Sequence, residues 1–350
     1  MKTKHFFPLA FVLLIATTAC INTVKDIEIN EKNFPDENFR AWVLEQEYGK
    51  DSILTAEEIA GIDTIEVCGD RDDIKNLKGI EYFTALTYLD CLNWPLIELD
   101  VSKNTKLKDL TCGSLLIGNG QLTILDISKN KALTKLYCGE NMLTELNLSE
   151  CTLLTEVDCN HNQLTELDIS KNYLLTELDC VENLLTTLDV SKNSALTYLS
   201  CDNNQLTSLD LSRCTSLTKL YCENNQLTSL DLSRCTSLTY LFCYNNQLTS
   251  LDLPRCTSLT KLYCYQNQIR DAAMDALVES LPTVNNGVMK VKWKLEDGNE
   301  MTTRQVYAAK AKGWTPYFGE SLKNGSEVWY GYDGIDEEGV YHLNLDVVTE

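Results

Sequence analysis

The sequence predicts an α/β solenoid of about ten short coils, and three features of its central region support this prediction. The first is a unit of 21 residues that recurs along the middle of the chain. The second is leucine at offsets 1, 4 and 11 of that unit, which is written LTxLxCxxNxLTxLDLSxxTx. The third is a cysteine at offset 6; these cysteines are Cys91, Cys112, Cys138, Cys159, Cys180, Cys201, Cys222, Cys243 and Cys264. A period of about 20–29 residues with this leucine pattern is typical of leucine-rich repeats.

Each predicted coil has an inward-facing strand and an inward-facing return segment, because offsets 14 and 16 are apolar as well. One coil cannot bury this face alone, so the coils must stack and stabilise one another. We place the solenoid at residues 62–269, with a weaker first coil near Ile62 and five extra residues within 113–121. Asparagine at offset 9 falls in the turn after the strand and must form hydrogen bonds if it is buried. These residues are Asn141, Asn162, Asn183, Asn204, Asn225, Asn246 and Asn267.

The segments on either side of the repeats are predicted to close the ends of the solenoid. Residues 20–61 predict a helical N-terminal cap, with a capping box formed by Thr55 and Glu58. Such caps cover the core that a terminal coil would otherwise expose. Residues 270–350 predict a closing helix that ends at Pro282, followed by a small α+β unit. Its strands are expected in GVMKVKWKL, EVWYGYDG and VYHLNLDV, its helix in TTRQVYAAKAKG, and its tryptophans in a small core.

Residues 1–19 have the features of a bacterial lipoprotein signal peptide. Met1–Lys4 carries two lysines, Phe6–Ile15 is apolar, and small residues lead to Cys20 in the sequence ATTAC. The apolar run is too short to span a bilayer. We expect Cys20 to be lipidated and to anchor the chain in the outer membrane or at the cell surface. Thr17 stands where such signals usually have a larger aliphatic residue, and looser versions of this kind are typical of Bacteroidetes. Plain secretion after cleavage near Ala19 is the alternative, and the sequence leaves the periplasmic and outer faces open.

The composition argues against nucleic acid as a partner. The formal net charge of the 350 residues is −21, whereas nucleic-acid binding needs a basic patch that neutralises phosphates. Much of the negative charge comes from an aspartate at offset 15 of the repeat. A Lys or Arg follows it three residues later, and this alternation of charge predicts that the row lies on a solvated convex edge. These aspartates are Asp100, Asp126, Asp168, Asp189, Asp210, Asp231 and Asp252.

Fifteen cysteines in an exported chain would ordinarily suggest disulfides. The offset-6 cysteines instead take an inward position, where neighbouring side chains point the same way and disulfide geometry is not expected. We therefore predict a buried ladder of free thiols that behave as small apolar groups. Four more cysteines take offset 19, where other coils have asparagine; these are Cys151, Cys214, Cys235 and Cys256. The chain has no C-x-x-C and three histidines in all, so we expect neither a metal nor another cofactor.

The repeats resemble the cysteine-ladder repeats of internalin J, a surface adhesin of Gram-positive bacteria. The resemblance rests on LTKLYCENNQLTSLDLSRCTSLTYLFCYNNQLTSLDL, LDISKN and LDVSKN, and it covers roughly residues 86–269. It implies a right-handed, curved solenoid with parallel strands on its concave face, and a role in adhesion or ligand recognition. The flanking units look like those of Bacteroidetes lipoproteins. No wall-sorting signal and no ligand-contact motif are shared, so the resemblance does not identify the ligand.

The outward positions of the strands vary between coils that are otherwise nearly identical. The stretch NQLTSLDLSRCTSLT is the same at 204–218 and 225–239, and the coils differ mainly at offsets 3, 5 and 7. Because strand side chains alternate, these offsets are expected to face outward. They hold seven aromatic residues, which we predict to form one exposed ligand-binding patch: Tyr198, Tyr221, Tyr240, Phe242, Tyr244, Tyr263 and Tyr265. The coils upstream give a second candidate, an acidic strip of Glu156, Asp158, Glu177, Asp179 and Glu182.

The sequence favours recognition of a protein or glycan ligand, including one from a host, over two alternatives. The first alternative is a structural spacer of the envelope, in which the tyrosines merely suit half-exposed strands. The second is a glycan-active enzyme that uses Glu156 and Glu177 as paired carboxylates. Such a pair needs a cleft and separated pKa values, and a row of like residues on an open face supplies neither. We therefore predict no catalytic residues.

Overall fold

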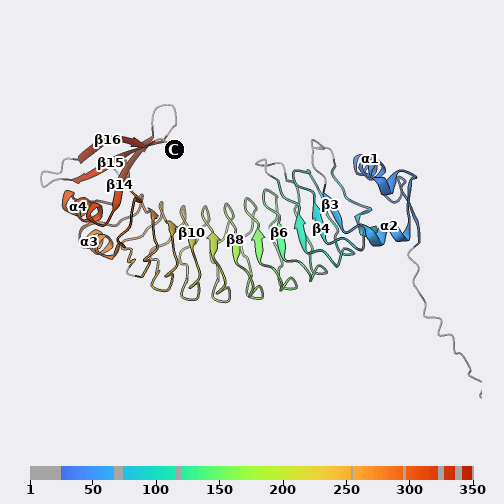
Figure 1. The fold of residues 1–350 in the computed structure, drawn as a ribbon, viewed down its shortest axis with the longest axis horizontal. Helices are drawn as coiled ribbons and strands as arrows, with labels where there is room; N and C mark the ends of the chain where they lie inside the picture. The colour runs from blue at the N-terminus through green and yellow to red at the C-terminus, as the bar shows by residue number, and fades with distance from the viewer. Residues whose placement is uncertain are drawn as a thin grey trace, which may run out of the picture.

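The computed structural model describes residues 25–66, 74–114, 118, 120–253, 255–294, 297–321, 327–335 and 341–348, with main chain alone for 335 and 341–348. Strands β3 to β16 form one sheet of 14 strands. Figure 1 shows a long, curved row of coils, with α1 and α2 at the N-terminal end and α3 and α4 at the other. The predicted solenoid with a helical cap and a C-terminal α+β unit is therefore confirmed. The predicted leader and Cys20 lie outside the described residues, and no helix within them is long and apolar enough to cross a membrane.

One carboxylate of the N-terminal cap both starts a helix and bonds to the first coils. Its elements are β1 (Ile27–Glu28), α1 (Glu37–Glu45), η1 (Glu47–Gly49), β2 (Ile53–Leu54) and α2 (Ala56–Gly61). Asp36 caps α1 through its Oδ1 atom, and its Oδ2 atom accepts hydrogen bonds from the N–H groups of Lys75 and Asn76. The predicted capping box of Thr55 and Glu58 opens α2. The antiparallel pair β1–β2 is an addition that sequence periodicity did not reveal.

Ten parallel strands of three residues each follow, one per coil. They are β3 (Thr64–Glu66), β4 (Tyr88–Asp90), β5 (Asp109–Thr111), β6 (Lys135–Tyr137), β7 (Glu156–Asp158), β8 (Glu177–Asp179), β9 (Tyr198–Ser200), β10 (Lys219–Tyr221), β11 (Tyr240–Phe242) and β12 (Lys261–Tyr263). Their register matches the repeat, because Leu199 pairs with Leu220 and Leu220 pairs with Leu241. Equivalent offsets of neighbouring coils therefore lie side by side along the curved solenoid.

The core consists of columns of leucine and cysteine. In the Leu196 coil the side chains of Leu196, Leu199, Cys201 and Leu206 are all completely buried. Thirteen cysteines of the described residues are buried and free. This confirms the prediction for the nine of the offset-6 ladder and adds the four at offset 19. The thiols of the offset-6 column point toward the next coil; for example, Cys180 Sγ lies 3.4 Å from the carbonyl oxygen of Ser200. Burial raises the pKa of these thiols, which keeps them protonated.

Each asparagine at offset 9 joins two coils with four hydrogen bonds. The Nδ2 group of Asn204 donates to the carbonyl oxygens of Cys180 (2.9 Å), Cys201 (3.2 Å) and Asp202 (3.1 Å). Its Oδ1 atom accepts from the main-chain N–H of Leu185 at 3.0 Å. The same bonds recur in the neighbouring coils through Asn162, Asn183, Asn225, Asn246 and Asn267. An asparagine amide satisfies donors and acceptors that the turn would otherwise leave buried without partners.

The structure also explains why asparagine and cysteine exchange at offset 19. Asn193 uses its Nδ2 group to donate to the carbonyl oxygens of Ile169 and Asn172, but its Oδ1 atom has no hydrogen-bond partner. Only a donor is therefore needed at this position. The thiol of Cys151 supplies one to the carbonyl oxygen of Ile127 at 3.5 Å.

The aspartates at offset 15 close turns on the opposite edge of the coil. The Oδ1 atom of Asp210 accepts a hydrogen bond from the N–H of Ser212 at 2.9 Å, and other coils repeat this contact. This is the geometry of an Asx turn. The hydrogen bonds from Ser212 hold the pKa of Asp210 below its usual value. The aspartate row is thus a turn-forming feature of the repeat.

The sheet continues beyond Ile269, where the repeats end in the sequence. The C-terminal elements are α3 (Asp271–Ser280), β13 (Gly287–Trp293), α4 (Thr303–Ala311), β14 (Trp314–Ser321), β15 (Glu327–Ile335) and β16 (Tyr341–Val348). β13 and β14 continue the parallel order, whereas β15 and β16 are antiparallel. β14 was not predicted, because Pro316 and the lack of a clear alternation obscure it. Trp314, Trp329 and Tyr332 are buried, as expected for the core of this unit.

Asn299 takes over the role of the repeat asparagines at this junction. Its Nδ2 group donates to the carbonyl oxygens of Cys264 and Val291, and its Oδ1 atom accepts from the N–H of Ile269. The buried amino group of Lys292 donates to the carbonyl oxygen of Asn299 at 2.7 Å. The C-terminal unit therefore extends the hydrogen-bond pattern of the solenoid by side chains that lie outside the repeat.

We expect replacement of Asn204 by Ala to destabilise the solenoid by about 2–4 kcal/mol, because four hydrogen bonds are lost and buried main-chain groups lose their partners. Urea unfolding followed by circular dichroism measures this change. Gln205→Ala alters an exposed side chain of the same coil and should change the unfolding free energy by less than about 0.5 kcal/mol. Equal effects of the two substitutions would refute the role assigned to Asn204.

We expect the thirteen buried thiols to resist alkylation by iodoacetamide in the folded protein and to react fully in denaturant. Their burial and their raised pKa values both suppress the reactive thiolate. Peptide mass spectrometry identifies the labelled residues. Rapid native labelling of the offset-6 column would contradict the buried ladder.

Candidate recognition surface on the strand face

The side chains at offsets 3 and 5 of β6 to β12 point away from the core and form a surface that we call the strand face. Within each strand the middle residue is buried, whereas the two flanking residues are in most cases partly or fully exposed. In-register pairing brings equivalent side chains of neighbouring coils into contact. The face carries aromatic residues on β9 to β12 and carboxylates on β7 and β8.

Four of the predicted aromatic residues form a row in which each ring touches the next. We call it the aromatic row; its members are Tyr198, Tyr221, Phe242 and Tyr263. The ring centroids of Tyr221 and Phe242 are 4.9 Å apart with the edge of one ring toward the face of the other, and those of Phe242 and Tyr263 are 4.1 Å apart and stacked. All four side chains are partly exposed. Tyr240 lies apart from this row, with the amino groups of Lys219 and Lys261 over its ring.

The expectation that offset 7 faces outward is wrong for several coils. Tyr265 is only 8% exposed, and Asp202 and Glu223 are also buried. The strands end at offset 5, and the residue at offset 8 has a positive φ, as in Asn224 (φ 52°). The chain therefore bends at offset 7, so the alternation of a strand no longer applies. Tyr244 remains partly exposed at this offset.

The C-terminal unit extends the aromatic surface with residues that the sequence analysis assigned only to a small core. Tyr265 stacks on Tyr244 at 4.3 Å and contacts the rings of Trp293 and Trp329 at 5.8 and 5.0 Å. Lys290 is 6% exposed, and its amino group lies 4.4 Å from the ring centroids of both Tyr263 and Trp329. A lysine on β13 therefore joins the aromatic row to the tryptophans. Had the strand in GVMKVKWKL been predicted to continue the sheet of the repeats, Lys290 and Trp293 would have been expected beside the aromatic residues of the last coils.

The predicted acidic strip surrounds a shallow hollow of about 210 Å³ on the same face. The hollow is lined by Tyr137, Glu156, Val157, Asp158, Glu177, Asp179 and Tyr198. Glu177 is exposed, and the carboxylates of Glu156, Asp158 and Asp179 are partly so. Glu156 is paired with Lys135 at 2.8 Å and accepts a hydrogen bond from Tyr137. The hollow is thus lined by carboxylates of β7 and β8 and by tyrosines of the strands on either side, β6 and β9.

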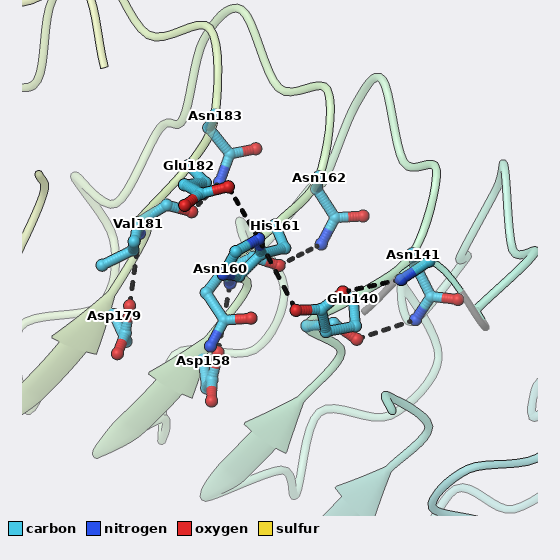
Figure 2. Close-up of polar contacts among 12 residues, drawn as sticks. Glu140, Asn141, Asp158, Asn160, His161, Asn162, Asp179, Val181, Glu182 and Asn183 are labelled. Atoms are coloured by element: carbon cyan, nitrogen blue, oxygen red, sulfur yellow. Dashed lines mark hydrogen bonds and ion pairs between the residues drawn. The ribbon is translucent and has the colours of Figure 1, made fainter. Parts of the chain in front are cut away.

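Glu182 belongs to a separate contact next to this hollow (Figure 2). His161 Nδ1 lies 2.9 Å from an Oε atom of Glu182 and 3.5 Å from one of Glu140, so three coils are joined by one imidazole. All three residues sit at offset 8 with positive φ values. The structure therefore places Glu182 in the turns and leaves four of the five predicted carboxylates in the hollow.

Two carboxyl groups, Asp179 on the strand face and Glu223 in the bend after β10, have strongly shifted pKa values. Burial, followed by the negative charge of Asp158, raises the pKa of Asp179 to about 7. Burial, followed by the negative charge of Asp202, raises the pKa of Glu223 to about 8. Glu223 is 7% exposed, and its Oε2 atom has no hydrogen-bond partner in the structure. Near neutral pH, Glu223 is therefore mostly a neutral carboxylic acid.

The repeat region matches a known family model. The model describes leucine-rich repeats in two copies, and it matches residues 194–234 and 236–277. These residues are leucine-rich repeats. A comparison with curated proteins found no relative.

Solved structures extend the similarity to most of the chain. The functional domain of InlJ from Listeria monocytogenes, which includes a cysteine ladder, is 34% identical with a TM-score of 0.66; the match covers 76% of this chain and 57% of that one. This chain thus spans little more than half of that structure. The internalin InlF of the same organism has 22% identity and a TM-score of 0.58, covering 83% of this chain and 90% of its own. A leucine-rich-repeat protein of Leptospira interrogans has 22% identity and a TM-score of 0.61, covering 78% and 70%. The latter two show the fold alone.

The pKa of Glu223 predicts how stability depends on pH. Between pH 4.5 and about 8 the folded state holds a proton that the unfolded state has lost, so stability falls as the pH rises, by up to about 1.4 kcal/mol per pH unit. Glu223→Gln copies the neutral acid and should flatten this dependence. Thermal unfolding at several pH values between 5 and 9 measures this pH dependence. Glu166→Gln, which removes the same charge from an exposed side chain, is the control and should keep the wild-type dependence. Parallel pH profiles for wild type and Glu223→Gln would contradict the assignment.

Proposed function

We propose that this chain recognises a protein or glycan ligand through the strand face, in the manner of a surface adhesin. The observation that carries the proposal is the aromatic row, whose rings remain partly exposed although leucine-rich repeats accept many residues at these offsets. Equivalent positions in other coils hold lysine, glutamate and serine. Partly exposed aromatic rings with polar tips are enriched in interfaces. Solenoids of this class use their extended curved surface for binding.

Similar proteins support the same class of function. The 34% identical InlJ domain shares the cysteine ladder with this chain, and internalin-like repeat proteins are binding or adhesion proteins found on surfaces or secreted. We infer an exported lipoprotein that is anchored through Cys20 and that meets its ligand outside the cytoplasm. The binding screen below includes host molecules. The ligand of InlJ is not transferred, because this chain spans only 57% of that structure.

The predicted catalytic pair of Glu156 and Glu177 receives no support from its geometry. Burial acts against ionisation of Glu156, but the hydrogen bonds from Lys135 and Tyr137 outweigh it and hold its pKa below the usual value. A general acid of a glycosidase needs a raised pKa. Glu177 lies on the rim of an open, shallow hollow. We therefore propose binding without catalysis.

The test is a binding screen of the chain without its leader on mucins, host matrix proteins and a glycan array. A variant with Tyr221→Ser, Phe242→Ser and Tyr263→Ser should lose at least about tenfold in affinity for the ligand that the wild type retains, since buried aromatic anchors carry much of an interface's energy. Surface plasmon resonance measures the loss.

The control variant carries Tyr173→Ser and Tyr307→Ser, which change exposed tyrosines elsewhere in the fold and should leave binding intact. Circular dichroism checks that both variants remain folded. Undiminished binding by the folded triple variant would contradict a site on the aromatic row. Absence of binding by the wild type across the whole screen would favour the structural spacer.

A further inference from the structure

We propose that the ligand of the strand face is an extended protein segment that places an arginine or lysine side chain in the acidic hollow and an apolar residue followed by a carboxylate on the aromatic row. This inference rests on the proposed function and adds the chemistry of the ligand. A protein ligand is favoured over a glycan because one end of the strand face is negatively charged and the other end carries positive charges. Carboxylates occupy β7 and β8, whereas lysines flank the aromatic rings of β10 to β13.

The hollow suits the head group of a basic side chain. Its carboxylates come from two adjacent strands, and Tyr137 and Tyr198 wall it on two sides. The amino group of Lys135 balances only Glu156 directly, which leaves Asp158, Asp179 and Glu177 as excess negative charge. One Oδ atom of Asp158 and one of Asp179 accept main-chain hydrogen bonds, from Asn160 and Val181 (Figure 2). Burial and, after it, the negative charge of Asp158 raise the pKa of Asp179, and a guanidinium or ammonium group in the hollow would offset that negative charge.

The other end of the face suits an apolar side chain next to an acidic one. Phe242 and Tyr263 present a stacked pair of rings, and both are partly exposed. The amino groups of Lys219 and Lys261 lie 5.7 and 5.1 Å from the ring centroid of Tyr240, at the other end of the strand that carries Phe242. An apolar side chain can therefore pack on the rings while a neighbouring carboxylate meets the lysines.

The distance between the two ends fixes the spacing in the ligand. The nearest strands of the two subsites, β8 and β11, are three strands apart, and neighbouring strands lie about 4.8 Å from one another, so the facing edges of the subsites are separated by roughly 14 Å. An extended chain covers about 3.3 Å per residue. The basic and apolar residues of the ligand are thus expected about four to five positions apart.

The experiment compares two synthetic peptides of identical composition by fluorescence anisotropy at pH 7.5. The spanning peptide has an arginine, a four-residue glycine–serine spacer, a phenylalanine and a glutamate. The compact peptide has the arginine directly before the phenylalanine, with the spacer at its end, and it cannot reach both subsites. We expect the spanning peptide to bind the chain at least about fivefold more tightly than the compact peptide. The difference corresponds to one charge-assisted hydrogen bond between the arginine and the carboxylates of the hollow.

Two protein variants test whether the tighter binding of the spanning peptide depends on the carboxylates of the hollow. Glu177→Gln with Asp179→Asn removes two charges and keeps the acceptor that the N–H of Val181 uses. This variant should bind both peptides equally. Glu145→Gln with Glu166→Gln removes two charges from exposed positions of the return segments and should keep the full preference. Circular dichroism confirms the fold of each variant.

Three results would overturn this inference: equal affinities of the two peptides for the wild type, a preference that persists in Glu177→Gln with Asp179→Asn, or no binding of either peptide up to about millimolar concentration. None of these results alters the proposed function, which depends on the separate loss of binding in the aromatic-row variant. A glycan bound through the aromatic row would therefore overturn the inference and leave the proposed function standing.

Discussion

The solenoid depends on one repeated interaction, the set of hydrogen bonds that the offset-9 asparagine makes between consecutive coils. Each coil contributes only three residues of strand, so the sheet alone fixes little of the chain. The tight turn after the strand exposes main-chain donors and acceptors to the core, where water cannot satisfy them. One amide side chain meets three carbonyls and one N–H there, as Asn204 does. These bonds join each of these coils to the one before it at equivalent positions.

Alignment of the columns separates the residues that fold the chain from those that are free to vary. The leucines, cysteines and asparagines are buried and repeat with little change. Offsets 3 and 5 of each strand contact mainly their equivalents in neighbouring coils, so substitutions there change the surface and leave the core intact. Over β7 to β12 this freedom produces an acidic hollow at one end and an aromatic row with flanking lysines at the other. The internal comparison of coils thus reveals candidate binding residues without any second sequence.

Periodicity predicted the ten coils, the free thiols and the caps because each depends on a pattern that is local in the sequence. The burial of Tyr265 could not be predicted in this way. It depends on a bend after the strand and on Trp293 and Trp329, which belong to a unit outside the repeat. Lys290 was missed for the same reason, since its position between Tyr263 and Trp329 follows from the unbroken pairing of β12 with β13. Asn299 likewise replaces a repeat asparagine from a different sequence context.

The central claim is that the aromatic row is in direct contact with a ligand. Site-specific photocrosslinking tests this claim most directly. Benzoylphenylalanine replaces Phe242 on the aromatic row in one variant and, as a control, the exposed Tyr173 outside the row in another. The chain is irradiated together with the mucin, matrix protein or glycan that it retains in the screen. The account predicts a covalent adduct from position 242 and none from position 173. An adduct from position 173 alone, or equal yields from both positions, would contradict it.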